Sequence, residues 1–126
     1  MDPKELQYTR TDEWVAVEGD LLTLGITDQL AKKLSPVVYV ELPEKGDDVL
    51  NDEPFGQIES VKDSAEIHSP VDGVVEEVNT ELVGSPALLE DDPYEKGWIA
   101  KIRLDIPEQL EDLLSYSEYK NLPKRR

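Results

Sequence analysis

The chain contains no cysteine, which excludes disulfide bonds, thiolate catalysis and metal sites built on cysteine. Any redox chemistry must therefore be supplied by a bound cofactor. Histidine occurs once, at His68, so no second histidine or cysteine is available to complete a metal site with it. We expect no metal centre, and the alternating pattern around His68 predicts a surface or edge position for it.

Basic residues are scarce, with 13 Lys and Arg against 29 Asp and Glu and a formal net charge of -16. This charge repels nucleic acid and anionic membrane surfaces, so we expect neither as a partner. No apolar run approaches the roughly 18 residues needed to cross a bilayer, and Met1–Glu5 does not resemble a secretion signal. These features predict a cytoplasmic protein, and acidic self-repulsion predicts a monomer.

The 126 residues are sufficient for one domain, residues 1–126, and 38% hydrophobic content is enough for a modest core. Short alternating runs separated by turn signals at Gly46, Gly73 and Pro93 indicate many short strands. The pattern therefore predicts a mainly β fold, a sandwich or a flattened barrel.

Two helices are expected beside the strands. Apolar residues at helical spacing follow Thr27, a favourable N-cap, and the segment ends before Pro36. A second helix is predicted from Pro107, which suits a first helical position, with Leu110, Leu113 and Leu114 on one face. We expect this second helix to pack on the side of the barrel.

Lys62 lies between two alternating runs, Pro54–Glu59 and Ala65–His68, which predict the strands of a hairpin. A lysine at a hairpin tip has little packing to do, and its long stem presents an amine that can be acylated. The sequence therefore makes Lys62 a candidate attachment point. The alternative is an ordinary solvated surface charge.

Lys62 belongs to an ordered set of motifs that runs through most of the chain, from about Tyr8 to Tyr119. The motifs are Thr11-Asp12-Glu13-Trp14, Leu24-Gly25-Ile26-Thr27-Asp28, Val38-Tyr39-Val40-Glu41-Leu42-Pro43-Glu44, Glu59-Ser60-Val61-Lys62, Ser69-Pro70-Val71-Asp72-Gly73, Asp92-Pro93-Tyr94, Gly97-Trp98 and Leu110-Glu111-Asp112-Leu113-Leu114. In order and in approximate spacing, these motifs resemble the glycine cleavage system H protein family.

The resemblance implies a lipoyl/biotinyl-type barrel-sandwich hybrid of two antiparallel sheets, with a short internal helix and a C-terminal helix. It implies lipoate bound covalently as an amide to Lys62, within the attachment motif of Glu59, Ser60 and Val61. Such a carrier shuttles the aminomethyl group of glycine between glycine decarboxylase (P protein), aminomethyltransferase (T protein) and dihydrolipoyl dehydrogenase (L protein). A lipoate-attaching enzyme is the fourth implied partner, and the carrier catalyses none of the steps.

The resemblance also implies a cleft in which acidic and hydroxyl groups meet the amine of the loaded arm. By position, the matching residues are Thr11, Glu13 and Glu66. The alternative for each is a place on a solvated acidic face.

Three departures from the family pattern leave the partner enzymes open: Asp12, the Ser35-Pro36 turn, and Asp63 directly after the lysine. An alternative is therefore an H protein-like lipoate carrier in sulfur oxidation with a heterodisulfide-reductase-like complex. A biotin carrier is a further alternative, although that family flanks its lysine with methionines and this chain has Val61 and Asp63. The last alternative is an unmodified acidic interaction module.

Overall fold

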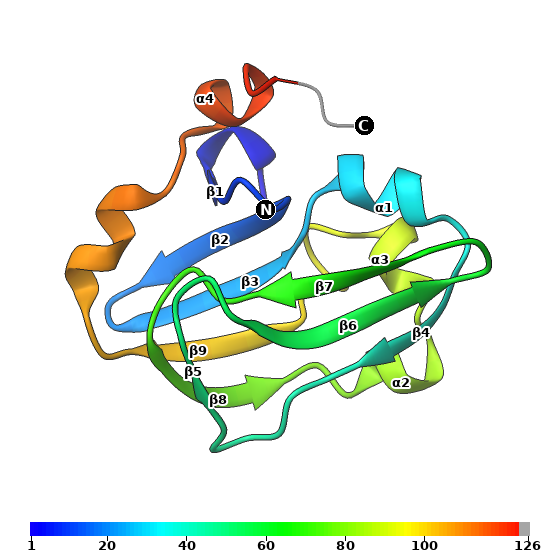
Figure 1. Ribbon diagram of the computed structural model, residues 1–126, viewed down its shortest axis with the longest axis horizontal. Helices are drawn as coiled ribbons and strands as arrows, with labels where there is room; N and C mark the ends of the chain where they lie inside the picture. Colours follow the sequence, from blue (N-terminus) through cyan, green and yellow to red (C-terminus); the bar gives the residue numbers. More distant parts are fainter. Residues whose placement is uncertain (124–126) are drawn as a thin grey trace.

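The computed structural model describes residues 1–123 and contains two antiparallel sheets. One sheet has six strands in the order β1-β2-β3-β9-β8-β5, and the other has three in the order β4-β6-β7 (Figure 1). The strands are β1 (Gln7–Tyr8), β2 (Glu13–Glu18), β3 (Leu21–Ile26), β4 (Val37–Glu41), β5 (Asp48–Val49), β6 (Pro54–Ser60), β7 (Ser64–His68), β8 (Gly73–Val78) and β9 (Ala100–Leu104). The expected mainly β, two-sheet architecture is confirmed.

The core lies between the two sheets and is built by alternation along the strands. Leu22 and Leu24 of β3 are fully buried, as are Ile58 of β6, Ile67 of β7 and Ile102 of β9. Residues two apart on a strand point to the same face of the sheet. Alternate side chains of each strand therefore point into this core, and the others point outward. The hydrophobic effect on these alternate positions fixes the register of both sheets.

The first predicted helix is α1 (Asp28–Leu34). Thr27 is its N-cap, and the Thr27 hydroxyl accepts a hydrogen bond from the backbone amide of Leu30 at 3.3 Å. Ala31 and Leu34 are buried on the inner face. The expected cap and apolar face are therefore confirmed. Two single-turn helices, α2 (Glu81–Gly84) and α3 (Leu88–Asp91), have too little periodicity to be predicted from the sequence.

The C-terminal segment differs from the prediction. A 3₁₀ helix, η2, covers Pro107–Asp112, and the chain is extended at Leu113. Leu114 then pairs with Tyr8 through two backbone hydrogen bonds of 2.8 Å. This pairing requires extended backbone at Leu114. The prediction that Leu110, Leu113 and Leu114 lie on one face of a helix is therefore wrong.

The true C-terminal helix is α4 (Tyr116–Lys120), which begins with a capping box between Ser115 and Glu118. It packs against β1 and the N-terminal 3₁₀ helix η1 (Pro3–Glu5), at the top of Figure 1. The ring of Tyr119 stacks on that of Tyr8, with centroids 4.7 Å apart. These residues join Trp14 in a second hydrophobic cluster, separate from the main core.

The Tyr119 hydroxyl connects three parts of the fold. It donates to the Asp12 carboxylate at 2.6 Å and lies 2.8 Å from the Thr27 hydroxyl. Burial raises the pKa of Tyr119 well above its usual range, and the adjacent Asp12 adds to this effect. The C-terminal helix therefore fixes the turn before β2, which presents residues of the candidate site.

Among residues 1–123, no helix has the length and apolar character needed to cross a membrane.

Candidate functional site

Lys62 occupies the three-residue turn between β6 and β7, as the hairpin pattern predicts. The turn is closed by the amide of Ser60, which donates to the carbonyl of Asp63 at 2.8 Å. The Ser60 hydroxyl donates to the same carbonyl at 2.9 Å and accepts from the Asp63 amide at 3.0 Å. Ser60 therefore holds both ends of the turn, while Lys62 itself is exposed.

The base of this turn is attached to the α1–β4 connection. The Val61 amide donates to the carbonyl of Pro36 at 3.3 Å, although the Val61 side chain is 73% exposed. In Figure 1 the hairpin tip lies at the right-hand end of the molecule, away from α4. Glu59 is also exposed and pairs with Tyr39 of β4 and Ser64 of β7. The attachment motif thus combines a fixed backbone with outward side chains.

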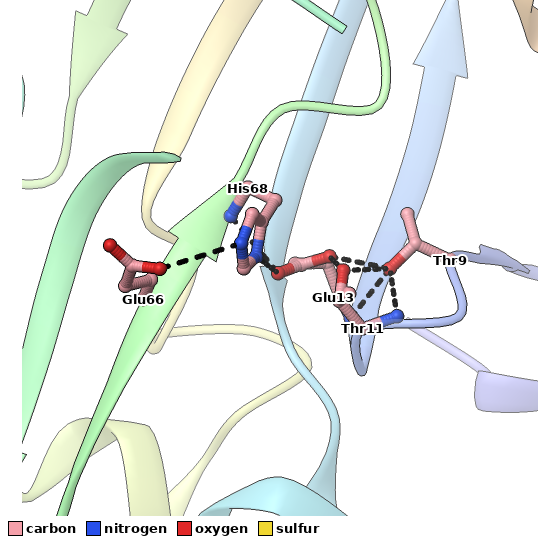
Figure 2. Close-up of polar contacts among 5 residues, drawn as sticks. All are labelled: Thr9, Thr11, Glu13, Glu66 and His68. Carbon is pink, nitrogen blue, oxygen red and sulfur yellow. Dashed lines mark hydrogen bonds and ion pairs between the residues drawn. The ribbon is translucent and has the colours of Figure 1, made fainter. Parts of the chain in front are cut away.

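Glu13 begins β2 and is fully buried, which is unusual for a carboxylate and requires hydrogen-bonding partners. Its Oε1 atom accepts from the hydroxyls of Thr9 and Thr11, each at 2.5 Å. Its Oε2 atom accepts from the backbone amide of His68 at 3.1 Å. The side chain therefore joins the turn before β2 to β7 in the other sheet (Figure 2).

His68 lies between two carboxylates, and Figure 2 shows this arrangement. Nδ1 is 3.6 Å from Glu13 Oε2, and Nε2 is 3.8 Å from Glu66 Oε1. Glu13 is the largest cause of a raised pKa of His68; partial burial opposes it, and Glu66 and Asp52 add to it. The site can therefore hold a positive charge on the imidazole.

The structure brings together all three residues assigned to the cleft, Thr11, Glu13 and Glu66. Thr11 bonds directly to Glu13, and Glu66 is linked to Glu13 through His68. Lys62 is separate from this group: within residues 1–123, no hydrogen bond or ion pair joins them. Of the cleft residues, Glu66 is 62% exposed and Glu13 is inaccessible, so the group extends from the surface into the interior.

Sequence reasoning missed His68. Its position on an edge strand is as predicted, because β7 ends the three-stranded sheet. His68 and Glu13 are 55 residues apart in the sequence and lie in different sheets, so the local pattern around His68 gives little information about their contact. The one available signal was its i, i+2 spacing from Glu66, which places both side chains on the same face of β7.

The chain is similar to known proteins over nearly its whole length. The family model for the glycine cleavage H-protein matches residues 6–126. The chain belongs to this family. The glycine cleavage system H protein of Staphylococcus carnosus is 48% identical over 120 residues, covering 95% of each chain. That of Rubrobacter xylanophilus is 51% identical over 117 residues, covering 93% of this chain and 90% of the relative.

A solved structure agrees with the sequence comparison. The crystal structure of a glycine cleavage system H protein from Mycobacterium marinum superimposes with a TM-score of 0.85 at 34% identity. It covers 94% of this chain and 95% of its own. Glycine cleavage H-proteins carry lipoate covalently on a lysine, and this chain has the same role of lipoyl carrier in the glycine cleavage system.

Proposed function

We propose that Lys62 is the lysine to which lipoate is attached. A lipoyl amide requires a lysine whose amine reaches solvent and can be presented to an attaching enzyme. Lys62 is exposed at the tip of a hairpin whose turn is fixed by Ser60, so it fits this requirement. Lipoate supplies a strained cyclic disulfide, which is readily reduced and reoxidised.

The protein's own contribution is tethering. A flexible lysine stem on a fixed hairpin keeps the attached group at high local concentration near any partner on which the domain docks. We infer that the chain is one carrier domain, residues 1–126, that is monomeric, acts in the cytoplasm and catalyses no step itself. Its partners are the glycine decarboxylase, the aminomethyltransferase, the dihydrolipoyl dehydrogenase and a lipoate-attaching enzyme.

The acidic and hydroxyl groups near β7 have a separate role in this proposal. Thr11, Glu13 and Glu66 form a site for the ammonium of the cargo, with Glu66 at its exposed mouth. The attachment motif, Glu59, Ser60 and Val61, presents the lysine to the attaching enzyme. The positions of the two groups support these separate roles. The cleft residues extend into the interior at Glu13, whereas the attachment motif lies at the tip of the hairpin.

Intact mass spectrometry tests the attachment site. Protein made in lipoate-competent cells should carry one lipoyl adduct, and Lys62→Arg should abolish it. Lys45→Arg is the matched control, because Lys45 is also an exposed lysine in a turn between strands. Loss of the adduct from the control alone, or retention in Lys62→Arg, would contradict the assignment.

Loading with cargo tests the partners. When the oxidised lipoylated chain is incubated with glycine and the glycine decarboxylase, the S–S bond of the lipoyl ring should open. One sulfur gains the aminomethyl group and the other a hydrogen, so the chain gains the mass of methylamine while glycine loses its carboxyl group as carbon dioxide. A fully lipoylated chain that stays unloaded would contradict these partners and indicate another lipoate-dependent pathway.

A further inference from the structure

His68 provides the only cationic side chain that contacts the buried Glu13 carboxylate among residues 1–123. Burying a carboxylate without an opposite charge is costly, although hydrogen bonds reduce that cost. Here the threonine hydroxyls satisfy Oε1, while Oε2 has a single hydrogen bond and faces the imidazole. The histidine is therefore placed where a second donor or a positive charge is needed.

The imidazole nitrogen that faces Glu13 has an unused hydrogen-bonding position. Nδ1 is buried and has no hydrogen-bond partner within residues 1–123, since its 3.6 Å separation from Oε2 is too long for one. The other nitrogen points to Glu66, which is mostly exposed. A shift of a few tenths of an ångström would let a protonated imidazole bond to both carboxylates.

An ammonium group and the imidazolium of His68 require the same acceptors at this site. Both are cations that donate hydrogen bonds, and both gain from contact with Glu13 and Glu66. The charged groups that raise the pKa of His68 are all acidic: Glu13 from β2, Glu66 from its own strand and Asp52 from the turn before β6. Two cations beside the same two carboxylates repel each other, so one excludes the other.

We propose that His68 is a positioning residue whose protonation decides whether Glu13 and Glu66 bind the ammonium of the cargo or the imidazolium of the protein. This rests on the proposed function of the cleft. With His68 neutral, no imidazolium competes for the carboxylates: the amine binds the exposed Glu66, and it reaches Glu13, which is inaccessible in this structure, when the imidazole turns aside. With His68 protonated, the imidazolium takes its place and the cargo amine is released from the cleft. The only transfer in this step is one proton between solvent and the imidazole.

The single histidine makes this testable by NMR, because every imidazole signal in the chain belongs to His68. Titration of the unlipoylated protein should give a pKa above the ordinary 6.5. Glu13→Gln should lower this pKa more than Glu66→Gln does. Glu108→Gln, which neutralises an exposed carboxylate outside the cluster, should leave it unchanged. A wild-type pKa at or below 6.5, or no change in Glu13→Gln, would overturn the proposal.

Competition with an amine is tested on the same signal. Methylammonium chloride should lower the His68 pKa relative to tetramethylammonium chloride at equal concentration, because the second cation cannot donate a hydrogen bond. Glu13→Gln should remove this difference. By reciprocity, protonation of His68 then weakens amine binding by the same factor. Identical titrations in the two salts would overturn the proposal.

The lipoylated, cargo-loaded protein gives the strongest form of the test. Tethering raises the local amine concentration, so the His68 pKa should fall by about one unit on loading, equivalent to a tenfold competition. The Lys62→Arg chain treated in parallel should show no fall. If no lipoyl adduct forms at Lys62, the attachment proposal fails, whereas the methylammonium titration still decides the role of His68.

Discussion

The carboxylate of Glu90 accepts a hydrogen bond from the backbone amide of Val37 at 2.6 Å, which connects α3 to the start of β4. The other oxygen of Glu90 accepts from the Ser35 hydroxyl at 2.5 Å. Between these residues lies Pro36, whose carbonyl receives the Val61 amide of the attachment hairpin. A single acidic side chain on a one-turn helix therefore supports the backbone beside Lys62.

Glu90→Gln should loosen this support. The glutamine amide keeps one oxygen acceptor but loses the negative charge, and its NH2 donor then meets either the Ser35 hydroxyl or the Val37 amide. We expect a loss of about 1.5–3 kcal/mol in the free energy of unfolding, the range for a hydrogen bond to a charged group, measured by urea denaturation. Lipoylation of Lys62 should also slow. Asp91→Asn, on the exposed side of the same helix, is the control, and an equal effect there would contradict the role of Glu90.

Ser60→Ala should make the attachment turn more mobile. The change removes two side-chain hydrogen bonds to Asp63 while keeping the backbone bond of the turn. We expect a loss of stability of about 1 kcal/mol and faster amide exchange at Val61 and Lys62. Ser117→Ala, at an exposed position of α4, should leave these amides unchanged. Unaltered exchange in Ser60→Ala would show that the backbone alone holds the turn.

Thr9→Val and Thr11→Val test the hydrogen bonds that hold Glu13 in the interior. Each change preserves side-chain shape but removes one donor to the buried Oε1 atom. Thr9→Val also removes the oxygen that accepts from the backbone amides of Thr11 and Glu13. We expect each to cost about 1–3 kcal/mol in thermal or urea unfolding, because a buried acceptor loses a partner. Thr80→Val is the matched control, since Thr80 is exposed and its hydroxyl caps no helix amide. Equal stability of all three variants would contradict this role.

Gly25→Ala tests the close packing of β3 on Trp14. A Cβ atom at position 25 would lie 2.6 Å from the indole Nε1, which donates to the Pro93 carbonyl at 2.9 Å. The buried indole must move, so we expect a loss of about 1–3 kcal/mol and altered tryptophan fluorescence. Gly84→Ala meets no atom within 4 Å and should be neutral or slightly stabilising. Similar effects of both changes would contradict the packing explanation.

Protonation of His68 should also affect the stability of the fold. Its pKa is raised above 6.5, chiefly by Glu13, so the protonated imidazole favours the folded state. This contribution is fully present below pH 6.5 and is lost as the pH rises through the raised folded value. The free energy of unfolding of wild type, relative to His68→Gln, should therefore fall as the pH rises above 6.5. If the difference in unfolding free energy between wild type and His68→Gln did not vary with pH, this prediction would be contradicted.

The parts of the fold that the sequence predicts are those with local causes. Alternation identified the strands around Lys62, and the cap at Thr27 identified α1, because each signal lies within a few residues. The C-terminal segment was mispredicted at Leu114, where a pairing with Tyr8 from the other end of the chain overrides helical spacing. Tertiary contacts of this kind leave no local pattern.

The same distinction applies to the candidate site. Lys62 was identifiable because a hairpin tip is a local feature, and the resemblance to a family supplied Glu13 and Glu66. The partnership of Glu13 with His68 depends on how the two sheets meet, which local sequence does not encode. The burial of Glu13 also depends on how the two sheets pack against each other.

The outer strand β7 has an acidic side chain at each end. The amide of Ser64 donates to the Asp63 carboxylate at 2.8 Å, and the amide of His68 donates to that of Glu13 at 3.1 Å. Open strand edges are places where other chains add strands and where proteins aggregate, and charged side chains on an edge oppose this. A carrier that visits several enzymes in turn benefits from such an edge. At both ends of this edge a partner meets a charged side chain already bonded to the strand, which opposes strand addition along β7.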